Sequence, residues 1–233
     1  MFRRAHPHLN ECRQSGSDAA TELFIVEGVS ASLAVCSLRD AEFQAVLSMQ
    51  GKPANAFKAS SRALRENTLF RELRAALGYG STDNTSPASD VDMAACRYQQ
   101  LVLLFDPDAD GIHCGALMLL YLYQQFPGLL AAGRIGIIRP PLFEMSYRET
   151  AMPDAPSHSR FAYTEDEYRL LQRELILAGV IGMKTHRMRG LGGMPTELLR
   201  STCIDRRTRH WFPLSVDDAR STMLLLAGSQ SIA

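Results

Sequence analysis

The sequence predicts an α/β fold, with a parallel sheet flanked by helices and a small, mainly helical segment at the C-terminal end. Two features support this fold class. Short apolar runs alternate with segments of helical periodicity, and two runs, ELFIVEG (22–28) and LVLLFDPDADG (101–111), end abruptly in acidic residues. Because open parallel sheets place their functional sites at the carboxyl ends of strands, these carboxylates are expected to lie at one edge of the sheet.

The first half of the chain is expected to contain one strand and two helices. Leu23–Val26 is apolar and stops at Glu-Gly, as a buried strand would, and a helix can open at Ser30–Val35. Apolar residues recur at helical spacing over Ser60–Leu77 with charges between them, which predicts a single amphipathic covering helix that ends at Gly78. The polar stretch Gly80–Asp90 is predicted to form a loop.

The second half continues the alternation of strand and helix. Leu101–Phe105 is predicted to be a second buried strand, Gly111–Gln125 a largely buried helix and Ile135–Ile138 a third strand. The Pro-rich segment Thr150–Arg160 is predicted to be a linker or loop. The smaller section after it contains a Gly-rich turn, RGLGGM (189–194).

Composition restricts the function classes. The 233 residues are 46% hydrophobic, enough for one good core or two small ones, and 25 basic residues balance 25 acidic ones. The chain therefore has no net positive charge to attract nucleic acid, and any polyanion site must come from a local concentration of basic residues. Between Lys184 and His210, seven Lys and Arg residues stand against two acids, which indicates either a polyanion surface or a solvated basic face.

The cysteine pattern and the lack of long apolar runs predict a soluble, cytoplasmic protein with no membrane contact. Five cysteines are spread along the chain without a C-x-x-C pair, which argues against a disulfide framework or a zinc site. The N-terminal MFRRAHPHLN lacks the apolar region of a signal peptide, and no uninterrupted apolar run reaches about 18 residues.

Three carboxylates, Asp106, Asp108 and Asp110, alternate just after the second strand. The D-x-D-x-D-G pattern begins an EF-hand loop, but the twelfth position is Leu117 instead of Glu, so a calcium loop is not expected. An aspartyl-phosphate phosphatase also places D-x-D after a strand, yet no downstream lysine and acidic pair is evident, and this stays a weaker alternative. In the simplest structural interpretation, one or two of the acids cap the helix that opens at Gly111.

A magnesium site accounts for all three acids. Like charges at alternate positions raise one another's pKa unless a cation compensates them. Glu27 also follows an apolar strand, so in a parallel sheet its carboxylate can converge with the three aspartates. Hard oxygen ligands of this kind suit Mg²⁺, which commonly binds through one or two protein carboxylates together with phosphate oxygens.

Five sequence blocks, in a fixed order, resemble those of a known family. They are ELFIVEGVSAS (22–32), FQAVLSMQGKPAN (43–55), FDPDADGIHC (105–114), RIGIIRPPLFEM (134–145) and HRMRGLGGMPTELL (186–199). The blocks resemble motifs of the TOPRIM domain and C-terminal tail of bacterial type IIA DNA topoisomerases of the gyrase B type, for example E-L-x-x-V-E-G-D-S-A-G and T-D-A-D-V-D-G-S-H-I. The resemblance covers nearly the whole chain from about residue 9.

The resemblance implies a domain organisation and a reaction. The expected parts are an N-terminal extension (1–20), a TOPRIM domain (21–148), a linker and helical segment (149–183) and a gyrase B-like tail (184–233), without the family's ATPase and transducer domains. In the family, a tyrosine on a separate A-type subunit attacks a DNA phosphate while TOPRIM carboxylates hold Mg²⁺, which stabilises the transferring phosphate. The implied partners are DNA, an A-type subunit and, as an option, a separately encoded ATPase.

The resemblance also implies roles for individual residues. The glutamate that serves the family as metal ligand and general acid is matched by Glu27. The other metal ligands are matched by Asp106, Asp108 and Asp110. Positions near DNA or the active site are matched by Lys52, His113, Arg187 and Arg189. No tyrosine of this chain matches a nucleophile, and the two on the apolar helix are expected in the core: Tyr121 and Tyr123.

The chain departs from the family at several charged positions. The residues that stand where the family has Lys or Arg are Cys36, Ala41, Gln50, Gly115 and Glu144. Val29 replaces an Asp of the first block, Ser32 and Leu33 replace a Gly pair, and Gly193 replaces the Glu of G-L-G-E-M. Because affinity for duplex DNA rises steeply with the number of phosphate contacts, the loss of five cations is expected to weaken DNA binding.

Three hypotheses for the function follow. The first is a magnesium-dependent subunit or fragment of an ATP-hydrolysing type II DNA topoisomerase, incomplete without a tyrosine-bearing A-type subunit. The second is a non-catalytic relative that regulates or mimics a topoisomerase subunit, in keeping with the reduced basic surface. The third, a stand-alone TOPRIM nuclease, ranks last because the P-P-L and G-L-G blocks resemble topoisomerases specifically.

Overall fold

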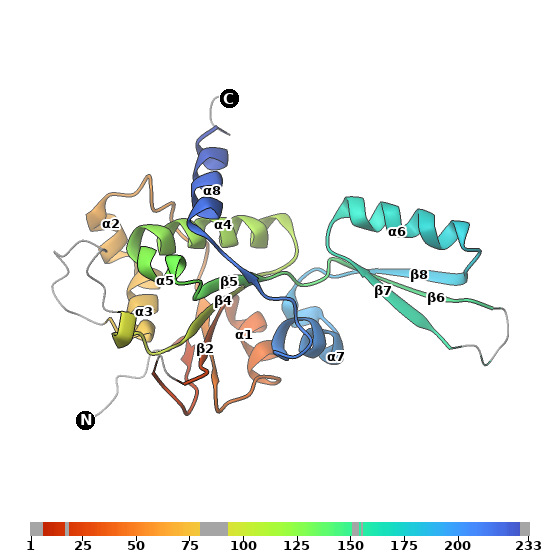
Figure 1. Cartoon of the computed structure of the whole chain (residues 1–233), viewed down its shortest axis with the longest axis horizontal. Helices are drawn as coiled ribbons and strands as arrows, with labels where there is room; N and C mark the ends of the chain where they lie inside the picture. The colour runs from red at the N-terminus through yellow and green to blue at the C-terminus, as the bar shows by residue number, and fades with distance from the viewer. Residues whose placement is uncertain (1–6, 17–18, 80–92, 151–153, 155, 229–233) are drawn as a thin grey trace.

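The computed structural model describes residues 7–16, 19–79, 93–150, 154 and 156–228 (Figure 1). A sheet domain with helices on both faces is followed by an arm that projects from it, and the chain then returns to the sheet domain (Figure 1). The predicted α/β class is confirmed. The loop predicted at Gly80–Asp90 lies outside the described residues.

The main sheet has six strands in the order β1-β3-β2-β4-β5-β9. Their bounds are β1 Leu9–Asn10, β2 Glu22–Glu27, β3 Gln44–Met49, β4 Gln100–Leu104, β5 Ile135–Ile138 and β9 Phe212–Pro213. The four central strands are parallel, and β1 and β9 pair antiparallel at the two edges. All three predicted strands are present as β2, β4 and β5. The chain places β3 on one side of β2 and β4 on the other, so the strand order reverses between β2 and β4.

Helices cover both faces of this sheet. The larger layer contains α2 (Ser61–Glu66), α3 (Thr68–Leu77), α4 (Ala109–Gln125), α5 (Pro127–Ala131) and α8 (Val216–Gly228). The opposite face is covered by α1 (Gly28–Cys36) and α7 (Thr196–Leu199). Strand β2 serves both cores, because Leu23 and Ile25 pack into the first and Phe24 and Val26 into the second. Among the described helices, none combines the length and apolar character needed to cross a bilayer.

The single helix predicted over Ser60–Leu77 is wrong, because the segment forms the two helices α2 and α3. Asn67 separates them with an extended backbone (φ −64°, ψ 121°), and its side-chain oxygen accepts a hydrogen bond from the Phe70 N–H at 3.2 Å. Asn favours such N-cap positions over helix interiors because its short amide competes for nearby backbone groups. Gly78 ends α3 in the left-handed conformation (φ 98°), as predicted.

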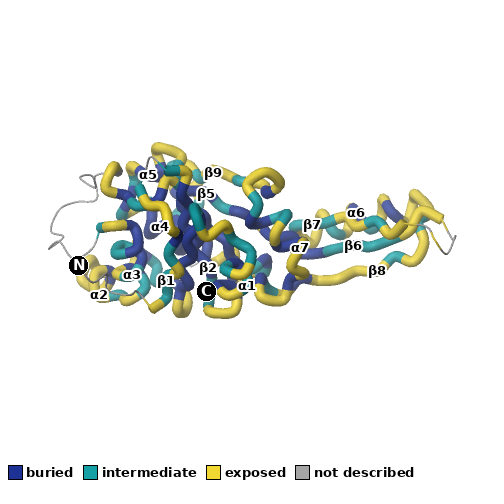
Figure 2. Tube along the Cα trace, turned by 90° about the horizontal axis from the view of Figure 1, so that it is seen from below, coloured by how far each residue is buried: buried dark blue, intermediate teal, exposed yellow. Residues whose placement is uncertain are grey.

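The arm is a three-stranded antiparallel sheet, in the order β7-β6-β8, with one helix on it. Its elements are β6 Phe143–Arg148, β7 His158–Ala162, α6 Glu165–Leu177 and β8 Ile181–Arg187. A small core that includes Met145, Leu171 and Leu175 lies between the sheet and α6. The prediction of a linker and helical segment for 149–183 missed the two strands in this part. Strand β8 is exposed along nearly its whole length, so its sequence carries no apolar alternation (Figure 2).

A buried ionic network holds the tail to the main sheet. From here on, the tail means residues 188–228, which follow the arm. Glu22, the first residue of β2, is 0% exposed, and both of its oxygens accept hydrogen bonds from the guanidinium of Arg209, whose side chain is 4% exposed. Gln44 Nε2 donates to the same carboxylate at 2.8 Å, and Arg206 Nε lies 2.9 Å from it. Two guanidinium groups and one amide of the protein thus compensate the buried carboxylate.

Trp211 packs the tail against β5. A Cβ built on Gly136 of that strand would overlap the indole ring, so glycine alone allows the ring to lie this close. Trp211 is the sole tryptophan of the chain. Its fluorescence therefore reports directly whether the tail is docked on the sheet.

Replacing Glu22 by Gln should destabilise the fold, because it leaves Arg209 buried without its counter-charge. The free energy of unfolding should fall by about 3 kcal/mol. Trp211 emission should shift to the red at lower denaturant than in the parent chain. Glu66→Gln, which removes one member of the exposed Arg62–Glu66 pair, is the matched control and should change little. Equal stability of the two variants would contradict the role given to Glu22.

Candidate metal centre

The predicted carboxylates lie at the carboxyl ends of two adjacent central strands. Glu27 is the last residue of β2, and the three aspartates follow β4, which pairs parallel with β2. This is the point where the strand order reverses, which is where open α/β sheets bind their ligands. The location predicted from the sequence is therefore the one observed.

Glu27 is half-buried and lies within the electrostatic influence of all three aspartates. Gly28 adopts a left-handed conformation (φ 74°) directly after it and turns the chain into α1. Burial raises the pKa of Glu27, the hydrogen bond with the Cys114 thiol opposes this, and the charges of the three aspartates raise it further. Burial, and then the charge of Glu27, raise the pKa of the Cys114 thiol to about 12. Cys114 thus acts as a neutral hydrogen-bond donor to Glu27.

Asp106 is held by the Gly-rich turn of the tail. Its Oδ1 accepts a hydrogen bond from the Leu191 N–H at 2.8 Å. Burial raises the pKa of Asp106, and this hydrogen bond opposes the rise. A Cβ on Gly190 would lie 2.9 Å from Asp106 Oδ2, and one on Gly192 would overlap Ser30 at the start of α1. The two glycines therefore allow the turn to close over both strand ends.

The other two aspartates also have partners within the protein. Asp108 caps α4, since its Oδ1 accepts a hydrogen bond from the Gly111 N–H at 2.9 Å, as the capping interpretation predicted. Asp110, in the first turn of α4, lies 2.8 Å from Lys52 Nζ. The hydrogen bond and charge of Lys52 lower the pKa of Asp110, and His113 adds to this.

The donor set fits a hard divalent cation, although its geometry is not that of a closed metal site. Within the part of the chain that the structure describes, no three His, Cys, Asp or Glu side chains converge closely enough to hold a metal. The charges of the three aspartates nevertheless contribute to the raised pKa of Glu27 at this edge of the sheet, and the four side chains offer only oxygen ligands. Mg²⁺ and its four proposed ligands, Glu27 and the three aspartates, stay predictions.

The four residues matched near DNA fall into two groups. Lys52 and His113 lie at the carboxylate cluster. Arg187 pairs with Glu165 at 3.2 Å and stacks over the Phe143 ring, so it belongs to the arm. A depression of about 490 Å³ beside the Gly-rich turn is lined by both arginines and three further residues, namely Thr185, His186, Arg187, Arg189 and Gly193. The structure thus places Lys52 and His113 at the carboxylate cluster and Arg187 and Arg189 at the basic depression.

The basic stretch at 184–210 exposes less free charge than its composition indicates. Most of its cations form ion pairs, namely Arg187, Arg200, Arg206, Arg207 and Arg209. Within the described residues, Lys184 and Arg189 have no such pair. Arg206 and Arg209 anchor the tail through Glu22, and the other three pair with near neighbours or within the arm. This arrangement favours neither a broad polyanion surface nor a fully solvated basic face.

Sequence reasoning missed Cys114 and the Glu22 network. Cys114 stands inside the recognised FDPDADGIHC block, one turn after Asp110, so its position on the helix was a usable signal. Tyr121 is buried and stacks on Phe70 with ring centroids 3.7 Å apart, which confirms that it is a core residue.

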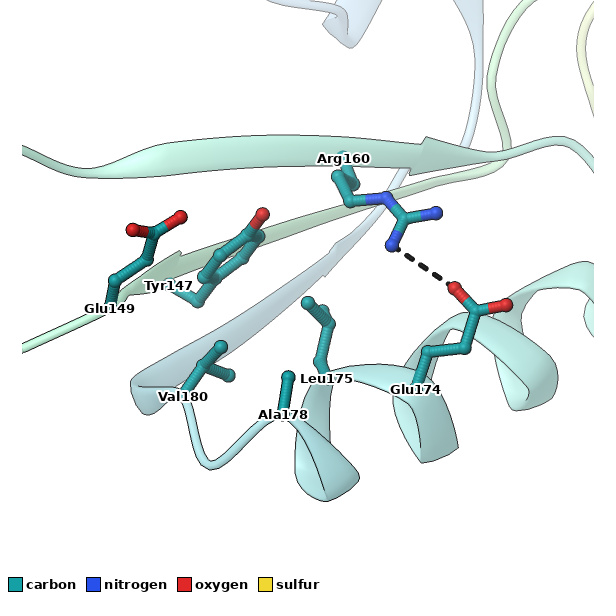
Figure 3. A pocket seen from close by; sticks show the side chains of 7 residues that line it. All are labelled: Tyr147, Glu149, Arg160, Glu174, Leu175, Ala178 and Val180. Carbon is teal, nitrogen blue, oxygen red and sulfur yellow. Dashed lines mark hydrogen bonds and ion pairs between the residues drawn. The ribbon is translucent and has the colours of Figure 1, made fainter.

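A second hollow, of about 420 Å³, lies on the arm (Figure 3). Leu175, Ala178 and Val180 form its apolar side, and the Arg160–Glu174 ion pair, 3.1 Å long, borders it. It contains none of the residues predicted to bind metal or DNA. The carboxylate cluster is therefore the candidate functional site.

The fold and the site place this protein in the class of helix-flanked parallel-sheet domains that carry an acidic site where the strand order reverses. The Toprim domain family matches residues 22–140, just over half of the chain, and the chain belongs to this family.

Similarity to curated proteins extends beyond that domain. The B subunit of DNA gyrase from Spiroplasma citri is 31% identical over 217 residues, which are 93% of this chain and 31% of the relative. The corresponding gyrase protein of Streptococcus pneumoniae (strain TIGR4) is 34% identical over 215 residues, and that of Haloferax volcanii 33% over 211, each covering 91% of this chain and about 30% of the relative. The similarity includes most of the arm and tail, and the chain spans about a third of the relatives' length.

Adding one methyl group at Gly111 should disturb the site, although Ala is usually the better helix former. A Cβ there would overlap the backbone oxygen of Asp106, whereas on Gly115, one turn along α4, it would meet only the Phe105 ring at 3.3 Å. Gly111→Ala should cost about 2 kcal/mol of unfolding free energy by overpacking, and Gly115→Ala less than about 1 kcal/mol. Denaturant unfolding measures both, and equal losses would contradict the close approach.

Glu27→Gln should stabilise the protein in metal-free buffer. Because the pKa of Glu27 is raised, the folded state holds this proton more tightly than the unfolded chain, so ionisation above the folded pKa destabilises the fold. At pH 7 the Tm should rise by about 2 °C, and the gain should vanish as the pH falls below about 4. Glu22→Gln, at the other end of the same strand, should shift the Tm the opposite way. A lower Tm for Glu27→Gln at pH 7 would show that the Glu27 charge is not a source of repulsion.

Proposed function

We propose that this chain is a magnesium-dependent TOPRIM subunit or fragment of a type IIA DNA topoisomerase. It assists strand cleavage and religation with an A-type subunit that carries the tyrosine, and a separate ATPase is a further candidate partner. The observation that supports this best is the placement of four carboxylates at the β2–β4 switch point in a chain whose similarity to gyrase B proteins runs through the tail. A cytoplasmic location, where DNA is accessible, belongs to the proposal.

The proposed chemistry assigns each side chain a task. A bound Mg²⁺ supplies positive charge to the transferring phosphate. Glu27, Asp106, Asp108 and Asp110 would hold it. Glu27, whose pKa is raised by burial and by the neighbouring aspartates, is also suited to retain a proton and pass it to the leaving 3′ oxygen. The Leu191 N–H keeps Asp106 in place, and the capped start of α4 fixes Asp108.

The DNA contacts are proposed to come from few cations. Lys52 and His113 at the cluster and Arg187 and Arg189 at the basic depression are the candidates. Since phosphate contacts dominate affinity, binding should be weak and strongly dependent on salt.

A second function, as a non-catalytic regulator or mimic of a topoisomerase subunit, is favoured by the altered basic positions. Glu144, where the family has Lys, accepts a hydrogen bond from Ser159 Oγ at 2.8 Å and so is built into the arm. Gly115, where the family has Arg, is buried against the Phe105 ring. One altered acidic position agrees with this, since Val29, where the family has Asp, is an exposed apolar residue beside the site.

A cleavage assay separates these functions. Supercoiled plasmid, Mg²⁺, the chain and the A-type subunit from the same genome are combined and quenched with detergent. Covalently cleaved DNA is expected, and Glu27→Gln and Asp106→Asn should each reduce it at least a hundredfold, while Glu66→Gln should leave it unchanged. Unchanged cleavage in both site variants would refute the proposal. Binding of the A-type subunit without cleavage would support the regulator, and nicking by the chain alone would support a nuclease.

A further inference from the structure

Lys52 connects the two sides of the carboxylate cluster. It lies in the turn after β3, while Asp110 lies at the start of α4, after β4. Strand β2 runs between β3 and β4, so the Lys52–Asp110 pair, 2.8 Å long, bridges the end of the strand that carries Glu27. The hydrogen bond with Asp110 raises the pKa of Lys52, and the charges of Asp110 and Glu27 raise it further, so its ammonium group lies in the field of the cluster.

Within the described residues, Lys52 is the one Lys or Arg that forms a salt bridge with a cluster carboxylate. The effect of this pair shows in the pKa values of the carboxylates. Asp110, which has the lysine, has a lowered pKa, whereas burial and the charges of neighbouring aspartates raise the pKa values of Glu27 and Asp106. A single ammonium thus compensates one charge at the open side of the cluster, where Asp110 is 81% exposed.

We propose that Lys52 is the resident counter-cation of this cluster and that a divalent cation competes with it for Asp110. The inference rests on the proposed function in one respect, that the cluster takes a divalent cation. An ammonium group and a metal cannot both contact the same carboxylate oxygen at short range without repelling each other. Metal binding therefore releases Lys52, and the intact pair lowers the affinity of the cluster for metal.

This role differs from that of a lysine whose only function is to contact DNA. Removing a cation that has no contact with the cluster changes metal affinity only through the long-range field, which salt screens. The chain offers a matched control in Lys58, six residues further on, which is exposed and forms no ion pair within the described residues. Lys52→Met and Lys58→Met remove the same charge, but only Lys52→Met also removes the contact with Asp110.

Calorimetric titration with Mn²⁺ alone, without DNA, tests the competition on the full chain. Lys52→Met should bind Mn²⁺ about threefold more tightly than the parent chain, the size expected for an exposed ion pair. Lys58→Met should match the parent, and so should Lys52→Arg, whose guanidinium can also pair with Asp110. In an Asp110→Asn background the effect of Lys52→Met should shrink to that of Lys58→Met.

The outcomes distinguish this inference from the function on which it rests. If the parent chain binds Mn²⁺ and Lys52→Met behaves like Lys58→Met or binds more weakly, the competition is wrong and the proposed function stands. If none of the chains binds Mn²⁺ while Trp211 emission shows the tail docked, both the inference and the magnesium-dependent function fall. A threefold gain confined to Lys52→Met supports the competition.

Discussion

The architecture of the site depends on the buried ion pair between Glu22 and Arg209. Breaking one partner of a fully buried pair leaves an uncompensated charge, a cost of about 3–5 kcal/mol, so the tail has a strong reason to stay docked on β2. Docking matters for function because the same tail carries the Gly-rich turn whose Leu191 N–H holds Asp106. A residue at the amino end of β2 thus controls, through the tail, the geometry at the carboxyl end of β2 and β4.

Strand β2 carries two glutamates in opposite electrostatic conditions. Glu22 is fully buried, and arginine and glutamine side chains meet its oxygens. Glu27 is less buried but is surrounded by carboxylates, with a neutral thiol from Cys114 as its hydrogen-bond donor. The first arrangement stabilises the fold, and the second stores repulsion that a bound cation can relieve. Sites that bind metal commonly retain such unfavourable charge, because the protein gives up some stability to keep the ligands together.

The sequence predicted β2, β4 and β5 and the carboxylate edge because they follow from local signals: apolar runs, and acids just beyond two of them. It did not predict β1, β3 and β9, which complete the main sheet. The break at Asn67 was missed because the apolar period continues across it, and only the cap hydrogen bond to Phe70 ends the helix. Strand β8 was missed because nearly all of its side chains are exposed, so its sequence shows no apolar alternation. The Glu22–Arg209 pair could not be predicted from composition, since 187 positions separate its members and a basic run is usually interpreted as surface charge.

We infer that the end of β2 and the end of β4 form one divalent-cation site closed by the docked tail. A crystal of the chain soaked with Mn²⁺, with the metal located by anomalous scattering, would reveal such a site. We expect a single strong peak between Glu27 and the aspartates, with Leu191 still bonded to Asp106 and the Lys52 ammonium displaced from Asp110. A peak elsewhere, or no peak while all four carboxylates keep their present protein partners, would contradict it.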